Sequence, residues 1–437
     1  METKCRSTDS RLQDPPLKID PFEPDEPSEI CSSSTTTSAH AQQDSRLAKE
    51  IYFKVGVPLH NAAQRGDWKA ARRIIKKYES ILRARITKGG QTVLHISAGA
   101  RHVRFVKKLL KLLDDHDLAI QDLKGNTAFT YAVAAGSRRV AEMMILKNPS
   151  LPTIRGGQGM STLYTAAAFG RGDIAWLLYP KLIKVIDEAE RTGIFFTFIS
   201  HNMYELAFRI LNDYPALAFA RDDNHETALH LLAQKPSAFS TKTSAIWRVL
   251  VYSCTKQNGK LAKVPGLQLL KCLLNQVLRQ NDSLVNEIIR MPSHVMFMAT
   301  KLGNSKFVAE LIDSHPDLIW ETDECNRTIF HIAVMYHHAS IFNLVHKLGV
   351  YKEFVLSFKD DQKNNILHLA AKLVPGHQLS NKSRHAIQMR GDLLWFEVRI
   401  YIPSILFSLL LVRGNSLLKK LDLFVKKIKK SFIQINT

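Results

Sequence analysis

A short stretch recurs along this chain at nearly constant spacing. LHNAAQRGD at Leu59 returns as VLHISAGAR at Val93, TLYTAAAFGRGD at Thr162 and ALHLLA at Ala228. Aligning each copy on the apolar residue before the His position gives Leu59, Leu94, Phe129, Leu163, Phe195, Leu229, Met296, Phe330 and Leu367. Successive separations are 35, 35, 34, 32, 34, 67, 34 and 37 residues, so the period is close to 34 with one double-length gap. Such a period predicts a row of like units.

Each unit is predicted to be a helical hairpin. In DLKGNTAFTYAVAAGSRRVAEMMI a polar turn precedes Thr127, whose hydroxyl can cap the next helix. The same start signal is expected at Thr92, Thr162, Thr227 and Thr328. Seven residues after the reference position stand Gly66, Gly136, Gly170 and Gly303, which predict a left-handed turn before a second helix. One hairpin cannot bury its own apolar face, so the sequence predicts an all-α stack of about nine units.

Five histidines occupy one position of the unit: His60, His95, His230, His331 and His368. Equivalent positions lie one repeat apart and cannot converge on one metal ion, so we expect hydrogen bonds between turn and helix instead. No metal, no cofactor and no enzyme activity are predicted, because the sequence shows no acid–base dyad and no glycine frame around a nucleophile. RGGQGM at Arg155 lacks the Lys-Ser/Thr ending of a phosphate loop and is predicted to be a hairpin turn.

The chain has 437 residues, 60 Lys or Arg against 40 Asp or Glu, and a formal charge of +20. Such a charge raises anionic membranes and nucleic acids as partners. The excess is spread along the sequence, and no Lys/Arg tract is interleaved with aromatic residues, which argues against strong nucleic-acid binding. Five cysteines without a CxxC pair fit a reducing compartment, and the start METKCRSTDS has no apolar segment typical of a secretory signal.

Several features resemble a known plant family. The TxLHxAA core resembles ankyrin repeats, and Pro-x-Leu steps follow second helices in NPSLPTIR at Asn148, YPALAFAR at Tyr214 and HPDLIWET at His315. IRMPSHVMFMATKLGNSKFVAELI at Ile289, NNILHLAAKL at Asn364 and IQMRGDLLWFEV at Ile387 also resemble the plant ankyrin proteins related to the accelerated-cell-death and salt-tolerance ankyrin proteins. The resemblance covers roughly residues 51 to 398. It implies an ankyrin-repeat solenoid on the cytosolic face of a membrane, with roles in defence and stress signalling.

The family's C-terminal transmembrane domain is marked by Pro-Gly-Gly, a triplet that does not occur here. The longest uncharged apolar runs, 192–204 and 400–412, have 13 residues each, and a spanning helix needs roughly 20. The expected organisation is a disordered leader (1–50), N-terminal repeats (51–233), an insertion with helix (234–290), C-terminal repeats (291–372), a junction (373–398), and an apolar segment with a basic amphipathic tail (399–437).

The tail predicts a C-terminal amphipathic helix with apolar and basic faces. Such a helix can lie on an anionic membrane surface or bind a calmodulin-type partner, or it can pack on the last repeat. The membrane-contact candidates are Leu417, Leu418, Leu421, Phe424, Lys426, Lys427 and Ile428.

The function predicted from the sequence is a non-enzymatic protein-interaction scaffold in the cytoplasm, near a membrane, in plant defence or stress signalling. Turn tips and first helices line the concave face of such arrays, so the turn tips are the predicted contacts with a protein partner. Those candidates are Lys88, Lys124, Gln158, Asp223, Asn224, Glu324, Gln362 and Lys363. The alternatives are a membrane-peripheral adaptor held by the tail and a weak nucleic-acid binder.

Overall fold

The computed structural model describes residues 52–239, 264–366 and 369, and there the fold is all-α, as the sequence predicts. No β-strand occurs among these residues. Two isolated antiparallel bridges, Gln121 with Thr127 and Arg221 with Thr227, close the base of turns. The chain divides into two compact units, Met1–Thr197 and Phe198–Thr437. The expected leader (1–50), junction (373–398) and tail (399–437) lie outside the described residues.

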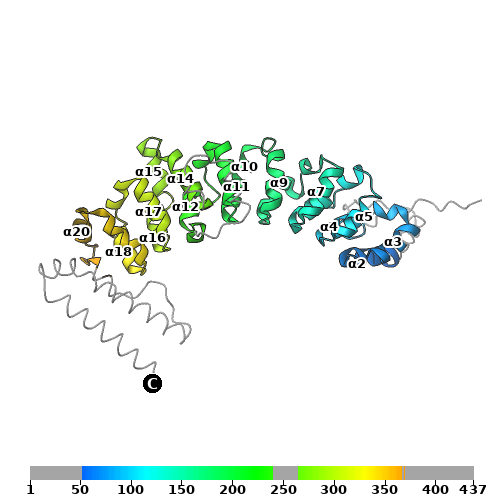
Figure 1. The fold of residues 1–437 in the computed structure, drawn as a ribbon, viewed down its shortest axis with the longest axis horizontal. Coiled ribbons are helices and arrows are strands. Elements are labelled where there is room, and N and C mark those ends of the chain that lie inside the picture. Colours follow the sequence, from blue (N-terminus) through cyan, green and yellow to red (C-terminus); the bar gives the residue numbers. More distant parts are fainter. Residues whose placement is uncertain (1–51, 240–263, 367–368, 370–437) are drawn as a thin grey trace, which may run out of the picture. The chain divides into compact units, whose positions relative to one another are not determined.

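The first unit contains four helical hairpins in succession. The pairs are α2 with α3, α4 with α5, α6 with α7 and α8 with α9, and each first helix also contacts the first helix of the next hairpin. The helices are α2 (Val57–Arg65), α3 (Trp68–Lys77), α4 (Val93–Gly99), α5 (Val103–Leu109), α6 (Ala128–Ala135), α7 (Arg138–Lys147), α8 (Thr162–Ala168) and α9 (Gly172–Leu182). A π-helical turn, η1 (Tyr52–Gly56), precedes α2, and α10 (Glu188–Ser200) spans the boundary of the units. Figure 1 labels most of these helices, from blue to green.

The second unit has two rows of helices. The first helices α12 (Ala228–Ala233), α16 (Val295–Lys301) and α18 (Ile329–Met335) contact one another in sequence. The second helices α11 (Tyr204–Asp213), α14 (Pro265–Val277), α17 (Ser305–Ser314) and α19 (Ala339–Phe342) do the same. The double-length gap in the sequence period therefore contains one more second helix, α14. It also holds an extra helix, α15 (Asp282–Arg290), while α20 (Tyr351–Leu356) follows α19.

Short 3-10 segments connect many of the helices. In the first unit these are η2 (Glu79–Leu82), η3 (His116–Ala119), η4 (Leu151–Thr153) and η5 (Gly157–Gly159). In the second unit they are η6 (Pro215–Ala218), η7 (Pro236–Phe239), η8 (Pro316–Trp320) and η9 (Asn343–Leu348). The Pro-x-Leu steps at Pro215 and Pro316 open η6 and η8, where proline suits the first position of a short helix, whereas the step at Pro149 ends on Leu151, the first residue of η4.

The two kinds of helix differ in how much of their surface is buried. In α4 every residue from Val93 to Ala98 is buried, because α4 lies between α2 and α6 and against α5. In α3 only Ala71 and Ile75 are buried. Each large apolar side chain removed from water contributes about 1.5 to 3 kcal/mol, and both kinds of helix supply such side chains, but a second helix such as α3 buries only one face. The second helices consequently keep one face free for polar side chains.

Helix starts follow the predicted pattern, with one correction. Thr127 is the N-cap of α6, and its hydroxyl oxygen accepts from the backbone N–H of Thr130 at 3.3 Å. Thr162 is not a cap: Ser161 caps α8 by accepting from the N–H of Tyr164 at 3.1 Å. Thr162 lies one residue inside the helix and donates its hydroxyl to the carbonyl of Pro152. The cap lies two residues before the reference position, and there the chain has Ser161.

The four turn glycines are left-handed, as predicted. Gly66, Gly136, Gly170 and Gly303 have φ of 73°, 78°, 66° and 72°. The unit of α18 has His337 at this place, with φ of 59°. None of the helices in the described part of the chain is both long and apolar enough to cross a membrane.

Candidate functional site

The predicted partner-contact residues all lie on exposed turns that precede first helices. Lys88, Lys124 and Gln158 belong to the first unit, and Asp223, Asn224, Glu324, Gln362 and Lys363 belong to the second. Gln158 and Lys363 have φ of 60° and 58°, so they occupy the left-handed position of their turns.

A buried or half-buried aspartate supports each of three tips. The Oδ1 atom of Asp122 accepts from the backbone N–H groups of Lys124 and Asn126 at 2.9 and 2.8 Å. Asp222 and Asp323 accept from two backbone N–H groups of their own turns in the same way, at 2.8 to 3.0 Å. Sequence reasoning missed this role, although an Asp five residues before the capping Thr was visible in all three units. These bonds fix the tip backbone and leave its side chains in solvent.

Consecutive tips are also bonded to each other in the first unit. The N–H of Leu123 donates to the carbonyl of Gly89 at 3.0 Å, and the N–H of Gly157 donates to Oδ1 of Asn126 at 2.9 Å. The turns that carry Lys88, Lys124 and Gln158 therefore lie side by side.

In the second unit the last two tips are joined in the same manner. The N–H of Asp361 donates to the carbonyl of Cys325 at 3.1 Å, and Asn326 donates its side-chain N–H to the carboxylate of Asp361. This links the turn of Glu324 to the turn of Gln362 and Lys363. The turn of Asp223 and Asn224 has a different neighbour: Arg221 at its base contacts the carbonyl of Met291 and the carboxylate of Glu287 on α15.

Each of three histidines ties the start of a first helix to a segment further along the chain. The N–H of Thr92 donates to Nδ1 of His95 at 3.2 Å, and Nε2 lies 3.1 Å from the carbonyl oxygen of Asn126 in the next turn. A backbone N–H can only donate and a carbonyl can only accept, so Nδ1 is unprotonated and Nε2 carries the proton. His230 and His331 repeat the arrangement with Thr227 and Ser293, and with Thr328 and Phe358.

The environment of these histidines keeps them neutral. Burial lowers the pKa of His95, His230 and His331, and the hydrogen bond from Nε2 to a backbone carbonyl opposes this only in part. The predicted bonds between turn and helix are thus present at three of the five histidines. At His60 these bonds are absent among the described residues: α2 begins at Val57 after Gly56, without a Thr cap, and Nδ1 of His60 lies 3.5 Å from Oδ1 of Asn61. His368 lies outside the described residues.

A second set of contacts between hairpins is made by the residue directly after the left-handed turn position, and sequence reasoning missed it. Nε2 of His102 lies 2.8 Å from the carbonyl of Gln64, and Nε of Arg171 donates to the carbonyl of Ala134 at 3.0 Å. Asn304 and His338 reach the first helix of the preceding hairpin in the same way. All four stand eight residues after a reference position, but their side chains differ too much to form a motif.

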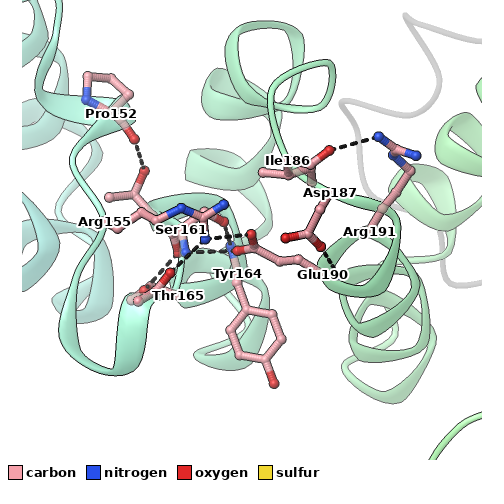
Figure 2. A network of polar contacts seen from close by, with 11 residues as sticks. Pro152, Arg155, Ser161, Tyr164, Thr165, Ile186, Asp187, Glu190 and Arg191 are labelled. Atoms are coloured by element: carbon pink, nitrogen blue, oxygen red, sulfur yellow. Dashed lines mark hydrogen bonds and ion pairs between the residues drawn. The ribbon is translucent and has the colours of Figure 1, made fainter.

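A polar network anchors the tip of Gln158 to α10. Arg155 donates from Nη1 to the carbonyl of Gly159 at 2.6 Å and to the carboxylate of Glu190 at 2.9 Å. The other carboxylate oxygen of Glu190 accepts from the N–H of Ser161 at 2.8 Å. In Figure 2, the carboxylate of Glu190 points toward both Arg155 and Ser161. The RGGQGM segment is thereby held as a turn, as the sequence predicts.

Within residues 52–239 and 264–366, no group of three His, Cys, Asp or Glu side chains is arranged to hold a metal ion. The membrane-contact candidates between Leu417 and Ile428 lie outside the described residues. No model of a known protein family matches this chain, and no curated protein matches it either.

Proposed function

We propose that the chain is an ankyrin-type repeat scaffold that binds a protein partner through its row of turn tips. The observation that carries the proposal is the bonding of successive tips through Gly89, Leu123, Asn126 and Gly157, which places side chains from separate hairpins next to each other. A fixed backbone with exposed polar side chains suits recognition of a polar protein surface. The resemblance to plant ankyrin proteins adds stress signalling at the cytosolic face of a membrane to this proposal.

The repeat assignment rests on the recurrence of one set of bonds. The Thr–His cap recurs at Thr92, Thr227 and Thr328, and the left-handed turn recurs seven residues after the reference position. A fold that repeats both its caps and its inter-hairpin contacts buries a continuous core by adding like units, and we propose about nine of them.

The experiment compares two variants of the full chain as bait in plant extract. The tip variant changes Lys88, Lys124 and Gln158 to serine, and the control changes Lys181, Lys184 and Gln64, which are also exposed. We expect the tip variant to lose a specific partner at least about tenfold, because contacts at the centre of an interface dominate affinity. The control should retain the partner within about twofold. Equal recovery by both variants, with unchanged circular dichroism, would overturn the proposal.

A further inference from the structure

The second helices of the first two hairpins, α3 and α5, have basic residues at the same spacing. Lys69, Arg72, Arg73 and Lys76 stand at positions i, i+3, i+4 and i+7 of α3, and Arg104, Lys107, Lys108 and Lys111 repeat that spacing along α5 and the residues after it. Residues at this spacing lie on one face of a helix. All eight side chains are exposed. The two sets are 35 residues apart, so they occupy equivalent places in consecutive units.

Side-chain contacts join the two helices into one surface. The rings of Trp68 on α3 and Phe105 on α5 pack edge to face, with centroids 5.2 Å apart. Nζ of Lys108 lies over the indole of Trp68, 5.5 Å from its centroid. We call the four cations of α3, the three of α5 and Lys111 just after α5 the basic face. The charge excess is spread along the sequence, yet the fold concentrates part of it here.

The charges of the basic face are not neutralised from within the described fold. None of the eight side chains forms an ion pair with a described residue, and neither α3 nor α5 contains Asp or Glu. The pattern ends at α7, where the equivalent positions are Arg139, Glu142, Met143 and Leu146, and Glu142 pairs with Arg138 at 2.8 Å. Like charges at i, i+4 spacing destabilise a helix. An anionic partner would relieve that repulsion.

The sequence contains a complementary acidic segment a short distance before the first described residue. Residues 14–29, DPPLKIDPFEPDEPSE, hold six Asp or Glu and one Lys. The described fold begins at Tyr52 with η1, which contacts α2, and α2 contacts α3. Residues 30–51 form a connection of 22 residues, for which a random coil has an end-to-end distance of roughly 25 Å. A ten-residue helix such as α3 is about 15 Å long, so the connection is long enough to reach.

We propose that the acidic segment 14–29 binds the basic face of α3 and α5 within the same chain. A short tether gives the segment an effective concentration in the millimolar range, so even weak charge pairing is largely satisfied. The contact is electrostatic and screened, since the Debye length falls from about 10 Å at 0.1 M salt to 3 Å at 1 M. The segment thereby competes with any external anion for this face. This inference does not depend on the turn tips or on a partner that binds them.

Carbodiimide cross-linking of the full chain tests the contact, because it joins a carboxylate only to an amine within contact distance. We expect peptides from residues 14–29 to be joined to Lys69, Lys76, Lys107 or Lys108 at least about fivefold more often than to Lys181 or Lys184. Lys181 on α9 and Lys184 just after it are both exposed and serve as the internal control. The preference should disappear in 1 M NaCl. An even distribution over both groups of lysines would overturn the proposal.

A pair of variants separates local charge from net charge. Arg73→Gln with Arg104→Gln weakens the basic face but keeps every lysine available for cross-linking, so the yield should fall at least about threefold. Arg209→Gln with Arg279→Gln removes the same charge from α11 and from just after α14, and the yield should not change. Equal yields in the two variants would contradict the proposal. A further variant neutralises four acidic residues of the segment: Asp20, Glu23, Asp25 and Glu26. If anionic vesicles or single-stranded DNA bind this variant and the unmodified chain equally well, the proposal is also contradicted.

Discussion

Nε2 of His331 lies 3.1 Å from the carbonyl oxygen of Phe358, 27 residues further along the chain. The other ring nitrogen of His331 receives the N–H of Thr328 at 3.3 Å. One imidazole thus caps its own helix and holds the start of the next turn. His95 and His230 do the same in their hairpins.

Replacing His331 with alanine should destabilise the protein. The change leaves the N–H of Thr328 and the carbonyl of Phe358 without a partner in a buried place and opens a small cavity, so we expect a loss of about 2 to 3 kcal/mol. Urea unfolding followed by circular dichroism measures it. His60→Ala is the matched control, because His60 occupies the same position of its unit without these bonds; its cost should stay within about 0.5 kcal/mol. Equal costs would show that the cap bonds contribute nothing.

Stability should fall when the pH is lowered through the range of histidine titration. Burial lowers the pKa of His95, His230 and His331 below 6.5, so the unfolded chain binds protons that the folded chain does not. Stability is therefore full above about pH 7.5 and declines from pH 6.5 downward, by at most about 1.4 kcal/mol per pH unit for each histidine. The urea midpoint between pH 5 and 8 measures this slope. His331→Gln should reduce the slope, and an identical slope in the variant and the unmodified protein would contradict the assignment.

Gly66→Ala should lower the free energy of unfolding by more than the strain of a left-handed alanine alone. A Cβ at Gly66, where φ is 73°, would lie 2.7 Å from Nδ1 of His102, whereas one at Gly159, with φ of 72°, would meet nothing within 4 Å. We expect about 1 kcal/mol for Gly159→Ala and about 1 to 2 kcal/mol more for Gly66→Ala.

A double-mutant cycle checks the origin of that difference. In a His102→Ala background, the extra cost of Gly66→Ala should disappear, because the ring that the methyl group would strike is gone. An undiminished cost would assign the effect to the backbone of the turn.

Glu190→Gln should loosen the turn of Gln158. The side chain of Glu190 is 12% exposed and accepts from both Arg155 and the N–H of Ser161. Loss of its charge should cost about 1 kcal/mol and should accelerate hydrogen exchange of the Ser161 amide about tenfold. Glu142→Gln, in an exposed pair with Arg138, should cost less than about 0.5 kcal/mol. Unchanged exchange at Ser161 would mean that Glu190 does not hold this turn.

Much of the helical pattern was predictable because it depends on neighbours in sequence. Thr127 caps its helix three residues away, and Gly136 turns the chain where only glycine is free of strain. The error at Thr162 arose because two hydroxyl residues adjoin, and only the backbone shows that Ser161 holds the extended conformation of a cap.

Contacts between hairpins could not be predicted in the same way. His102 and Arg171 perform one task with different side chains, and the aspartate below each tip stands beside other polar residues that do nothing similar. A hydrogen bond to a backbone carbonyl requires a donor at the correct distance, and several residue types supply one. The donors of these contacts therefore differ from unit to unit, whereas the aspartate below the tips stands five residues before the capping Thr in three units.

The sequence by itself determined the repeated hairpins, because caps, left-handed turns and apolar spacing act within a few residues. Only the tertiary structure decided that the tips of Lys88, Lys124 and Gln158 lie side by side and that Trp68 and Phe105 bring two basic helices together. Both results depend on how one unit sits against the next. That placement is set by close packing of buried side chains. A period of about 34 residues indicates that the units pack together, but it does not specify which side chains meet.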